Sequence, residues 1–262
     1  MEADEIDKAA SVLLDAYASR VPVAPLSDTY PGLSVDDAYA IQQAQVVSWA
    51  AAGAVVKGHK VGLTSAAMQA QLGVSQPDFG VLLDSMFLPE GMTAPVSGFL
   101  QPRAEPEIAF VLGRPLAGPG VTVAEALAAV DFVLPALEII DSRIADWKIT
   151  LPDTVADNAS SAAVVLGSRP VKPSELDLSL TGCLLYRGGV IVGTGAGGAV
   201  LGSPVNALVW LANTLGARGA ALAPGHVILP GSACAAVPFG PGDTIAAAFD
   251  RIGTVSVTFS AQ

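Results

Sequence analysis

The sequence predicts an α+β fold in which a helical N-terminal region precedes a larger, β-rich domain. In the first part of the chain apolar residues recur at helical spacing, whereas from residue 56 onward short apolar runs alternate with Gly and Pro. No stretch between the two parts has the composition of a flexible linker, so we expect them to pack together. We place the helical region at residues 1–55 and the β-rich domain at residues 56–262.

The composition bounds the class of protein. The 262 residues are 52% hydrophobic and 14% charged, which predicts a substantial core. A net charge of −11 argues against nucleic acid and anionic membrane surfaces as partners. No uninterrupted apolar stretch approaches the about 18 residues of a membrane span. The high hydropathy of such a chain indicates buried subunit contacts, and we expect a homo-oligomer.

The chain ends and the cysteines indicate a reducing compartment. The acidic N-terminus has no signal-peptide pattern. Cys183 and Cys234 lie in unrelated segments without metal-ligand spacing, so we expect buried free thiols. These features predict a cytoplasmic protein.

The predicted helices have recognisable ends. Ser34 and Asp37 form a capping box for a helix that stops near Gly53, and Thr122 and Glu125 form another. Ser203 is a predicted N-cap that precedes a Pro in the first helical position. The expected helices are 4–20, 34–53, a short one at 66–72 capped by Thr64, 123–130, and 204–215, which should stop at Gly216.

The predicted strands follow the helical region. A strand over residues 55–63 comes first, and Asp78 follows in a turn-like segment. Residues 184–192 read as a hairpin with a Gly-Gly turn, and 243–250 should pair with 254–260. Residues 193–198 match the G-x-G-x-x-G pattern, but no acidic residue follows at the distance that a ribose would need. We therefore interpret these glycines as sites of close backbone approach.

Two carboxylates, Glu105 and Glu107, begin a run that is otherwise apolar. Because side chains alternate along a strand, both point to the same face, where like charges repel. A Lys, an Arg or a hard divalent cation between them would relieve the repulsion, and a solvated sheet edge is the alternative. Pro106 lies between them and cannot donate a ladder hydrogen bond, which predicts a strand start or edge.

A third carboxylate, Glu138, lies within an apolar run that ends at Ile140. Its simplest structural interpretation is an ion pair with Arg143 or Arg103. Together with Glu105 and Glu107 it would provide three carboxylates from two strands, which suits a hard metal ion.

Other polar candidates are less distinctive. Lys60 could be an ordinary surface lysine, but its apolar neighbours would bury it beside a carboxylate or an anion. His59 and His226 have no evident nucleophilic partner and are expected to be structural. Residues 153–161 read as a polar loop before a strand.

In order along the chain, these segments resemble the 2-keto-4-pentenoate hydratase family of the fumarylacetoacetate hydrolase superfamily. The segments that carry the resemblance are Lys60-Val61-Gly62-Leu63-Thr64-Ser65, Gln76-Pro77-Asp78-Phe79-Gly80, Pro102-Arg103-Ala104-Glu105-Pro106-Glu107-Ile108-Ala109, Leu134-Pro135-Ala136-Leu137-Glu138, Asp157-Asn158-Ala159-Ser160 and Val200-Leu201-Gly202-Ser203-Pro204. One position departs from the family pattern, because Cys234 aligns where many relatives carry Thr.

The resemblance implies a fold, a cofactor and a set of site residues. The β-rich domain would be a mixed β-roll or sandwich and would be catalytic. Glu105, Glu107 and Glu138 would hold Mg²⁺ or Mn²⁺. Lys60, with a pKa lowered by burial, and Asp78 would handle protons; the backbone N–H groups of Leu63 or Thr64 and the hydroxyl of Ser160 would bind the substrate carboxylate.

The implied reaction adds water to a 2-hydroxy-2,4-dienoate, giving a 4-hydroxy-2-oxoalkanoate in meta-cleavage catabolism of aromatic compounds. The alternatives are a 4-oxalocrotonate decarboxylase, a C–C hydrolase with His59 as water activator, and a non-catalytic partner subunit. The family further suggests pentamers or decamers, and a complex with a related decarboxylase or a downstream aldolase.

Overall fold

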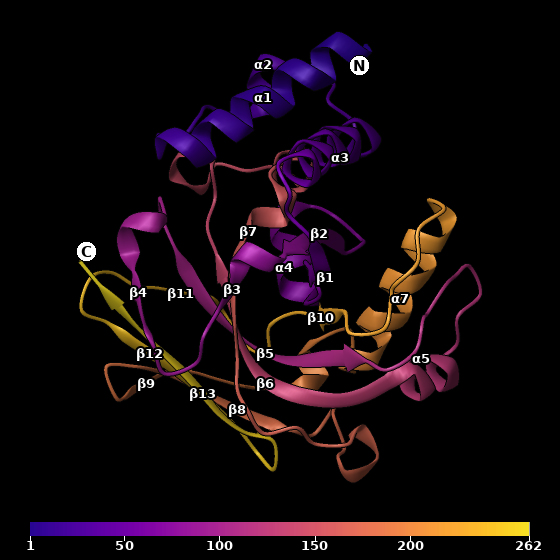
Figure 1. Ribbon diagram of the computed structural model, residues 1–262, viewed down its shortest axis with the longest axis vertical. Helices are drawn as coiled ribbons and strands as arrows, with labels where there is room; N and C mark the ends of the chain where they lie inside the picture. The colour runs from indigo at the N-terminus through magenta and orange to yellow at the C-terminus, as the bar shows by residue number, and fades with distance from the viewer. Residues whose placement is uncertain (262) are drawn as a thin grey trace.

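Two β-sheets form the centre of the molecule, and a bundle of helices lies over one end of them (Figure 1). This computed structural model describes residues 1–261, apart from the side chains of residues 71 and 72. The predicted α+β class with a helical N-terminal region is confirmed. The α-helices are α1 (Ala3–Ser19), α2 (Leu26–Thr29), α3 (Val35–Ala51), α4 (Ala66–Leu72), α5 (Val123–Ala129), α6 (Leu151–Ala156) and α7 (Pro204–Ala217).

The N-terminal helices α1, α2 and α3 lie together, as the indigo ribbons of Figure 1 show. The predicted capping box of α3 is present: the Asp37 N–H donates to Ser34 Oγ, and the Ser34 N–H donates to Asp37 Oδ2. Helix α3 packs against both α1 and α6. The division of the chain at residue 55 stays a prediction.

The larger sheet mixes parallel and antiparallel pairs and contains most of the residues singled out from the sequence. Strand β1 pairs in parallel with β10 and antiparallel with β2, while β5, β6 and β7 pair antiparallel. Its order is β2 (Asp78–Leu83), β1 (Val56–Gly62), β10 (Val227–Leu229), β5 (Arg103–Leu112), β6 (Val130–Ile140), β7 (Ser161–Leu166) and β3 (Phe87–Leu88), with β11 (Val237–Pro238) pairing with β5.

The smaller sheet contains both predicted hairpins. Strands β8 and β9 form the first, and β12 and β13 form the second. Its order is β4 (Thr93–Pro95), β13 (Gly253–Ser260), β12 (Thr244–Phe249), β8 (Gly182–Arg187) and β9 (Val190–Ala196). Strands β12 and β13 pack against β6, so apolar side chains between the two sheets form the core.

Among the described residues, no helix combines the length and the apolar character that crossing a membrane requires.

Three local predictions were wrong. Ser65, not Thr64, caps α4, because its Oγ accepts a hydrogen bond from the Met68 N–H. Asp78 is not in a turn but begins β2, where it pairs with Gly62. Helix α7 runs one residue past Gly216, to Ala217.

The glycines of residues 193–198 are explained by close packing of the backbone. A Cβ on Gly195 would lie 1.9 Å from the carbonyl oxygen of Ala233, and one on Gly197 would lie 1.9 Å from that of Leu178. Only Gly leaves room for such contacts. These glycines therefore let Ala233 and Cys234 lie close to β9.

Candidate active site

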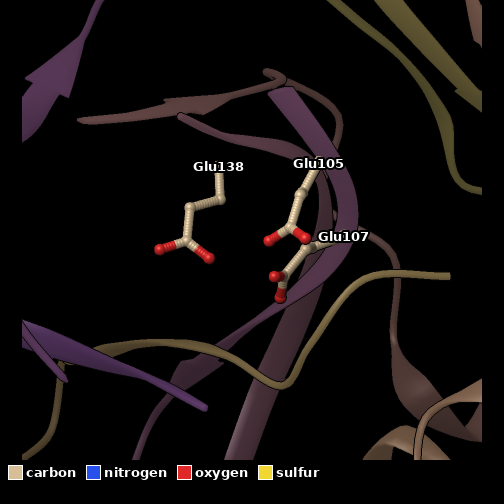
Figure 2. A group of neighbouring side chains, drawn as sticks. All are labelled: Glu105, Glu107 and Glu138. Carbon is tan, nitrogen blue, oxygen red and sulfur yellow. The ribbon is translucent and has the colours of Figure 1, made fainter. Parts of the chain in front are cut away.

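The carboxylates of Glu105, Glu107 and Glu138 point into a common space (Figure 2). Strands β5 and β6 place Glu105 directly opposite Glu138, and they place Glu107 opposite the small Ala136. All of these side chains project from the same face of the sheet. One oxygen atom from each carboxylate lies within 4.8 Å of the others.

Pro106 lies inside the larger sheet but at a local gap in its hydrogen bonding. Its carbonyl accepts from the Ala233 N–H at 3.2 Å, so its nitrogen also faces the side of β5 away from β6. On that side β11 pairs with residues 103 and 104 and β10 pairs with residues 110 and 111, which leaves Pro106 between them. Because no described strand pairs with Pro106 on that side, its lack of an N–H group removes no hydrogen bond from the sheet.

The carboxylate cluster has the chemistry of a divalent cation site. Glu107 and Glu138 are buried, and Glu107 Oε1 and both Glu138 oxygens lack a hydrogen-bond donor. Burial raises the pKa of all three carboxyl groups, that of Glu105 to about 7, since carboxylates packed together out of water favour protons. Free oxygen donors in such a cluster fit a hard cation.

Lys60 is buried at the centre of the site and is not a surface lysine. Its Nζ lies 3.5 Å from Glu138 Oε2 and donates a hydrogen bond of 3.0 Å to the Ala159 carbonyl. The ion-pair partner of Glu138 is thus Lys60; the expectation of Arg143 or Arg103 was wrong.

The expected direction of the Lys60 pKa was also wrong. Burial acts to lower this pKa, but the negative charges of Glu138, Asp78, Glu105 and Glu107 outweigh burial and raise it. Lys60 is therefore an ammonium group in the arrangement described here.

Asp78 lies beside Lys60, and Gly62 leaves room for the pair. Strands β1 and β2 place Lys60 opposite Gly80 and Gly62 opposite Asp78, all on one face. A Cβ on Gly62 would lie 2.1 Å from Asp78 Oδ1 and 3.5 Å from Lys60 Nζ. Asp78 is buried, its Oδ1 has no hydrogen-bond partner, and burial raises its pKa despite the nearby Lys60.

The segment before β7 is not the open polar loop that the composition suggested. It forms α6 and a short 3₁₀ turn, η4 (Asn158–Ser160), and all three residues of the turn are buried. The Ser160 hydroxyl lies 3.4 Å from that of Thr154. Ser160 directly follows Ala159, whose carbonyl accepts the hydrogen bond from Lys60.

Leu63 and Thr64 directly follow β1. Leu63 adopts a left-handed conformation with φ of 55°, and the carbonyl groups of both residues accept hydrogen bonds, from Gln69 Nε2 and the Leu201 N–H. Among the described residues, neither backbone N–H has an acceptor. Thr64 is buried against Gly231.

Sequence reasoning missed several groups at the site. The Gly231 N–H donates to Glu107 Oε2 at 2.7 Å, and the Ala159 carbonyl accepts from Lys60. Backbone groups carry no residue-type signal, so no pattern could have predicted them. The predicted structural His59 is buried, and its Nδ1 has no hydrogen-bond partner.

The fold and site define the class of protein, and sequence comparison agrees. The model of the family described as Fumarylacetoacetate (FAA) hydrolase C-terminal matches residues 52–260. The chain belongs to this family, as its motifs predicted.

Within the family, the chain is similar to named hydratases. It is 49% identical to 2-keto-4-pentenoate hydratase of Paraburkholderia xenovorans (strain LB400) over 262 residues, which covers 100% of this chain and 97% of the relative. It is 44% identical to 2-oxo-hept-4-ene-1,7-dioate hydratase of Escherichia coli over 250 residues, 93% of this chain and 94% of the relative. The predicted resemblance to the 2-keto-4-pentenoate hydratases is confirmed.

A solved structure of a decarboxylase is also similar to this chain. It is 4-oxalocrotonate decarboxylase from Pseudomonas putida G7, complexed with magnesium and adipate. It superposes with a TM-score of 0.96 at 36% identity and covers 99% of this chain and 98% of its own. The same decarboxylase has been solved with calcium and acetate.

Proposed function

We propose that this protein is a divalent-metal-dependent hydro-lyase that adds water to a 2-hydroxy-2,4-dienoate and yields a 4-hydroxy-2-oxoalkanoate. The observation that carries the proposal is a buried cluster in which three glutamates, Lys60 and Asp78 meet with oxygen atoms that lack partners. The names of the similar hydratases support the reaction, and they place it in the meta-cleavage catabolism of aromatic compounds.

Glu105, Glu107 and Glu138 would hold Mg²⁺ or Mn²⁺. The magnesium and calcium in the similar decarboxylase structures support a divalent ion. The chemistry that such an ion supplies is Lewis-acid stabilisation of negative charge on the oxygen atoms of a 2-oxo acid.

Lys60 and Asp78 would divide the proton transfers between them. Lys60 Nζ would first pass its own proton to a neighbouring carboxylate and would then take the proton from the C2 hydroxyl. Protonation at C5 then gives the 2-oxo-3-enoate. Asp78 Oδ1 has no partner and can accept a proton from the water whose oxygen bonds to C4, while C3 gains a proton. The sum is the addition of one water molecule.

The substrate carboxylate would be held by groups that have donors to spare. These are the N–H groups of Leu63 and Thr64 and the hydroxyl of Ser160. A buried site keeps other water away from the reacting dienoate. As further proposals, the protein would be a cytoplasmic homo-oligomer, pentameric or decameric, without nucleic-acid or membrane partners.

The function is tested by incubating the purified protein with 2-hydroxypenta-2,4-dienoate and Mg²⁺. We expect loss of dienol absorbance and formation of 4-hydroxy-2-oxopentanoate, identified by NMR. A parallel reaction uses 4-oxalocrotonate and measures released CO₂.

The parallel reaction addresses the second candidate function, a 4-oxalocrotonate decarboxylase, which the similarity to the solved decarboxylase favours. Release of CO₂ without hydration of the pentadienoate would show that the protein is a decarboxylase and not a hydratase. Turnover of neither substrate would instead support a non-catalytic subunit that assembles with a related decarboxylase or a downstream aldolase.

A further inference from the structure

The side chain of Asn158 occupies the place of a neighbouring strand at the edge of β2. The Val81 N–H donates to Asn158 Oδ1 at 2.7 Å, and Asn158 Nδ2 donates to the Val81 carbonyl at 2.9 Å. Strand β2 is the last strand on this side of the larger sheet, and Asn158 is fully buried. One carboxamide therefore makes both hydrogen bonds that a paired residue would make.

The rest of this strand edge is closed in the same way. Phe79, two residues earlier, donates its N–H to the Tyr39 hydroxyl at 3.3 Å and accepts from Gln42 Nε2 at 2.9 Å. Side chains thus replace a further strand along β2. Only Asn158 among them belongs to the turn that contacts Lys60.

The backbone of that turn has an uncommon conformation. Asn158, Ala159 and Ser160 have φ values of 52°, 51° and 55°, so three consecutive non-glycine residues lie in the left-handed region. Such a run is unfavourable by itself and persists only where its surroundings hold it. Besides Asn158, the Ser160 carbonyl accepts from the Asp141 N–H at 2.8 Å.

Gly80 lets the turn approach β2 closely. A Cβ at this position would lie 2.4 Å from the carbonyl oxygen of Asn158. Gly80 is also the residue opposite Lys60 in β1. The contact between turn and strand is therefore made beside the lysine itself.

We propose that Asn158 is a positioning residue for the reaction, a role that rests on the function proposed above for Lys60. By fixing the left-handed turn to Val81, it directs the Ala159 carbonyl at Lys60 Nζ and so sets the place of the ammonium group between Glu138 and Asp78. Asn158 itself need not touch the substrate.

Two substitutions separate the side chain from the backbone conformation. Asn158→Asp tolerates the left-handed region but turns a carboxylate oxygen toward the Val81 carbonyl in place of the donor. Asn158→Gly removes both hydrogen bonds and relieves the strain. We expect each variant to lower kcat by about 100-fold, the order of loss for a catalytic group displaced by about 1 Å. The Kd for Mg²⁺ should stay within about threefold of wild type, since none of the three glutamates is changed.

Gln45→Leu is the matched control. Gln45 is another buried amide, and its Nε2 donates to the carbonyls of Ala156 at 2.7 Å and Ile41 at 3.2 Å and not to a residue of the turn. We expect it to lower Tm about as much as the Asn158 variants and to leave kcat within about threefold of wild type. Gly80→Ala displaces the turn in a second way, because the added methyl group pushes on the turn while Asn158 is kept. We expect this variant to show the same loss of kcat.

A second readout does not depend on turnover. Amine-reactive labelling followed by peptide mass spectrometry measures how accessible Lys60 is. We expect Lys60 to react at least about tenfold faster in Asn158→Gly than in wild type or in Gln45→Leu. Equal labelling rates, or folded Asn158 variants with wild-type kcat, would overturn the positioning role. An inactive wild-type protein that still shows the labelling difference would contradict the proposed function and leave the positioning role supported.

Discussion

Lys60 is surrounded by more negative charge than it can balance. Glu138 and Asp78 lie next to it, and Glu105 and Glu107 complete a set of four buried or half-buried acids around one ammonium group. Burial raises the pKa of each acid, and neighbouring carboxylates raise it further for Glu105 and Glu107. The four acids in turn raise the pKa of Lys60 against the effect of burial. A bound divalent cation would compensate the remaining charge, so the electrostatics of single residues already favour a metal site.

His59 provides a residue-level test through pH. Burial lowers its pKa from 6.5 to about 3, so the folded protein keeps it neutral while the unfolded chain takes up a proton below pH 6.5. The unfolded state then binds more protons, and stability falls as pH falls. Between pH 6.5 and 4.5 this histidine should cost wild type about 1.4 kcal/mol of unfolding free energy per pH unit.

The measurement compares urea unfolding of wild type and His59→Gln across this pH range. Both proteins contain the same carboxyl groups, whose raised pKa values act in the opposite direction and stabilise the fold as pH falls. The difference between the two stability curves therefore reports His59 alone. His226→Gln is the control, because His226 is only half-buried. Parallel stability curves for wild type and His59→Gln would contradict a buried neutral His59.

At the scale of elements, Arg143 links the N-terminal helices to the larger sheet. Its Nε pairs with Asp157 Oδ1 at 2.5 Å, another guanidinium nitrogen donates to the Asp157 carbonyl at 2.7 Å, and its guanidinium lies 4.2 Å from the ring centre of Tyr17 in α1. Its own carbonyl accepts from the Val23 N–H at 2.8 Å. Asp157 directly precedes the left-handed turn, so the same ion pair supports the site and the helices.

Arg143→Ala should therefore be strongly destabilising. It leaves the buried Asp157 carboxylate without its cation, a change that costs about 3–5 kcal/mol. Urea unfolding at neutral pH measures the loss. Lys172→Ala, which breaks the exposed pair with Asp131, should cost no more than about 1 kcal/mol. Equal losses for the two variants would show that Arg143 does not hold these elements together.

Local sequence signals predicted some elements, whereas contacts between distant segments decided others. Helix caps at Ser34, Thr122 and Ser203 are local signals, and the helices start where these residues indicate. Strand alternation likewise predicted that Glu105 and Glu107 share a face. The register that sets Glu138 opposite Glu105, and the fold that brings Lys60 to Glu138, depend on contacts between distant segments. Asp78 was misplaced because its Pro-containing neighbourhood resembles a turn, whereas pairing with β1 makes it a strand.

At the scale of the molecule, the site exists only where separate parts of the chain meet. Strands β1 and β2 bring Lys60 and Asp78, strands β5 and β6 bring the carboxylates, and the turn before β7 and the backbone near Gly231 complete the cluster. Strands β1, β2, β5 and β6 all belong to the larger sheet, which fixes their side chains relative to one another. The geometry of the proposed site therefore depends on the fold of the larger sheet.

In the proposed function, the three glutamates bind the divalent ion on which hydration depends. Calorimetric titration of Mg²⁺ into wild type and Glu107→Gln, with the rate of dienol loss measured on the same samples, tests it most directly. Circular dichroism verifies that the variant is folded, as expected for a near-isosteric change. We expect wild type to bind one ion per chain and to hydrate the dienoate, and we expect Glu107→Gln to lose both properties. A folded Glu107→Gln protein that binds Mg²⁺ and hydrates the dienoate as wild type does would show that these glutamates do not hold the ion.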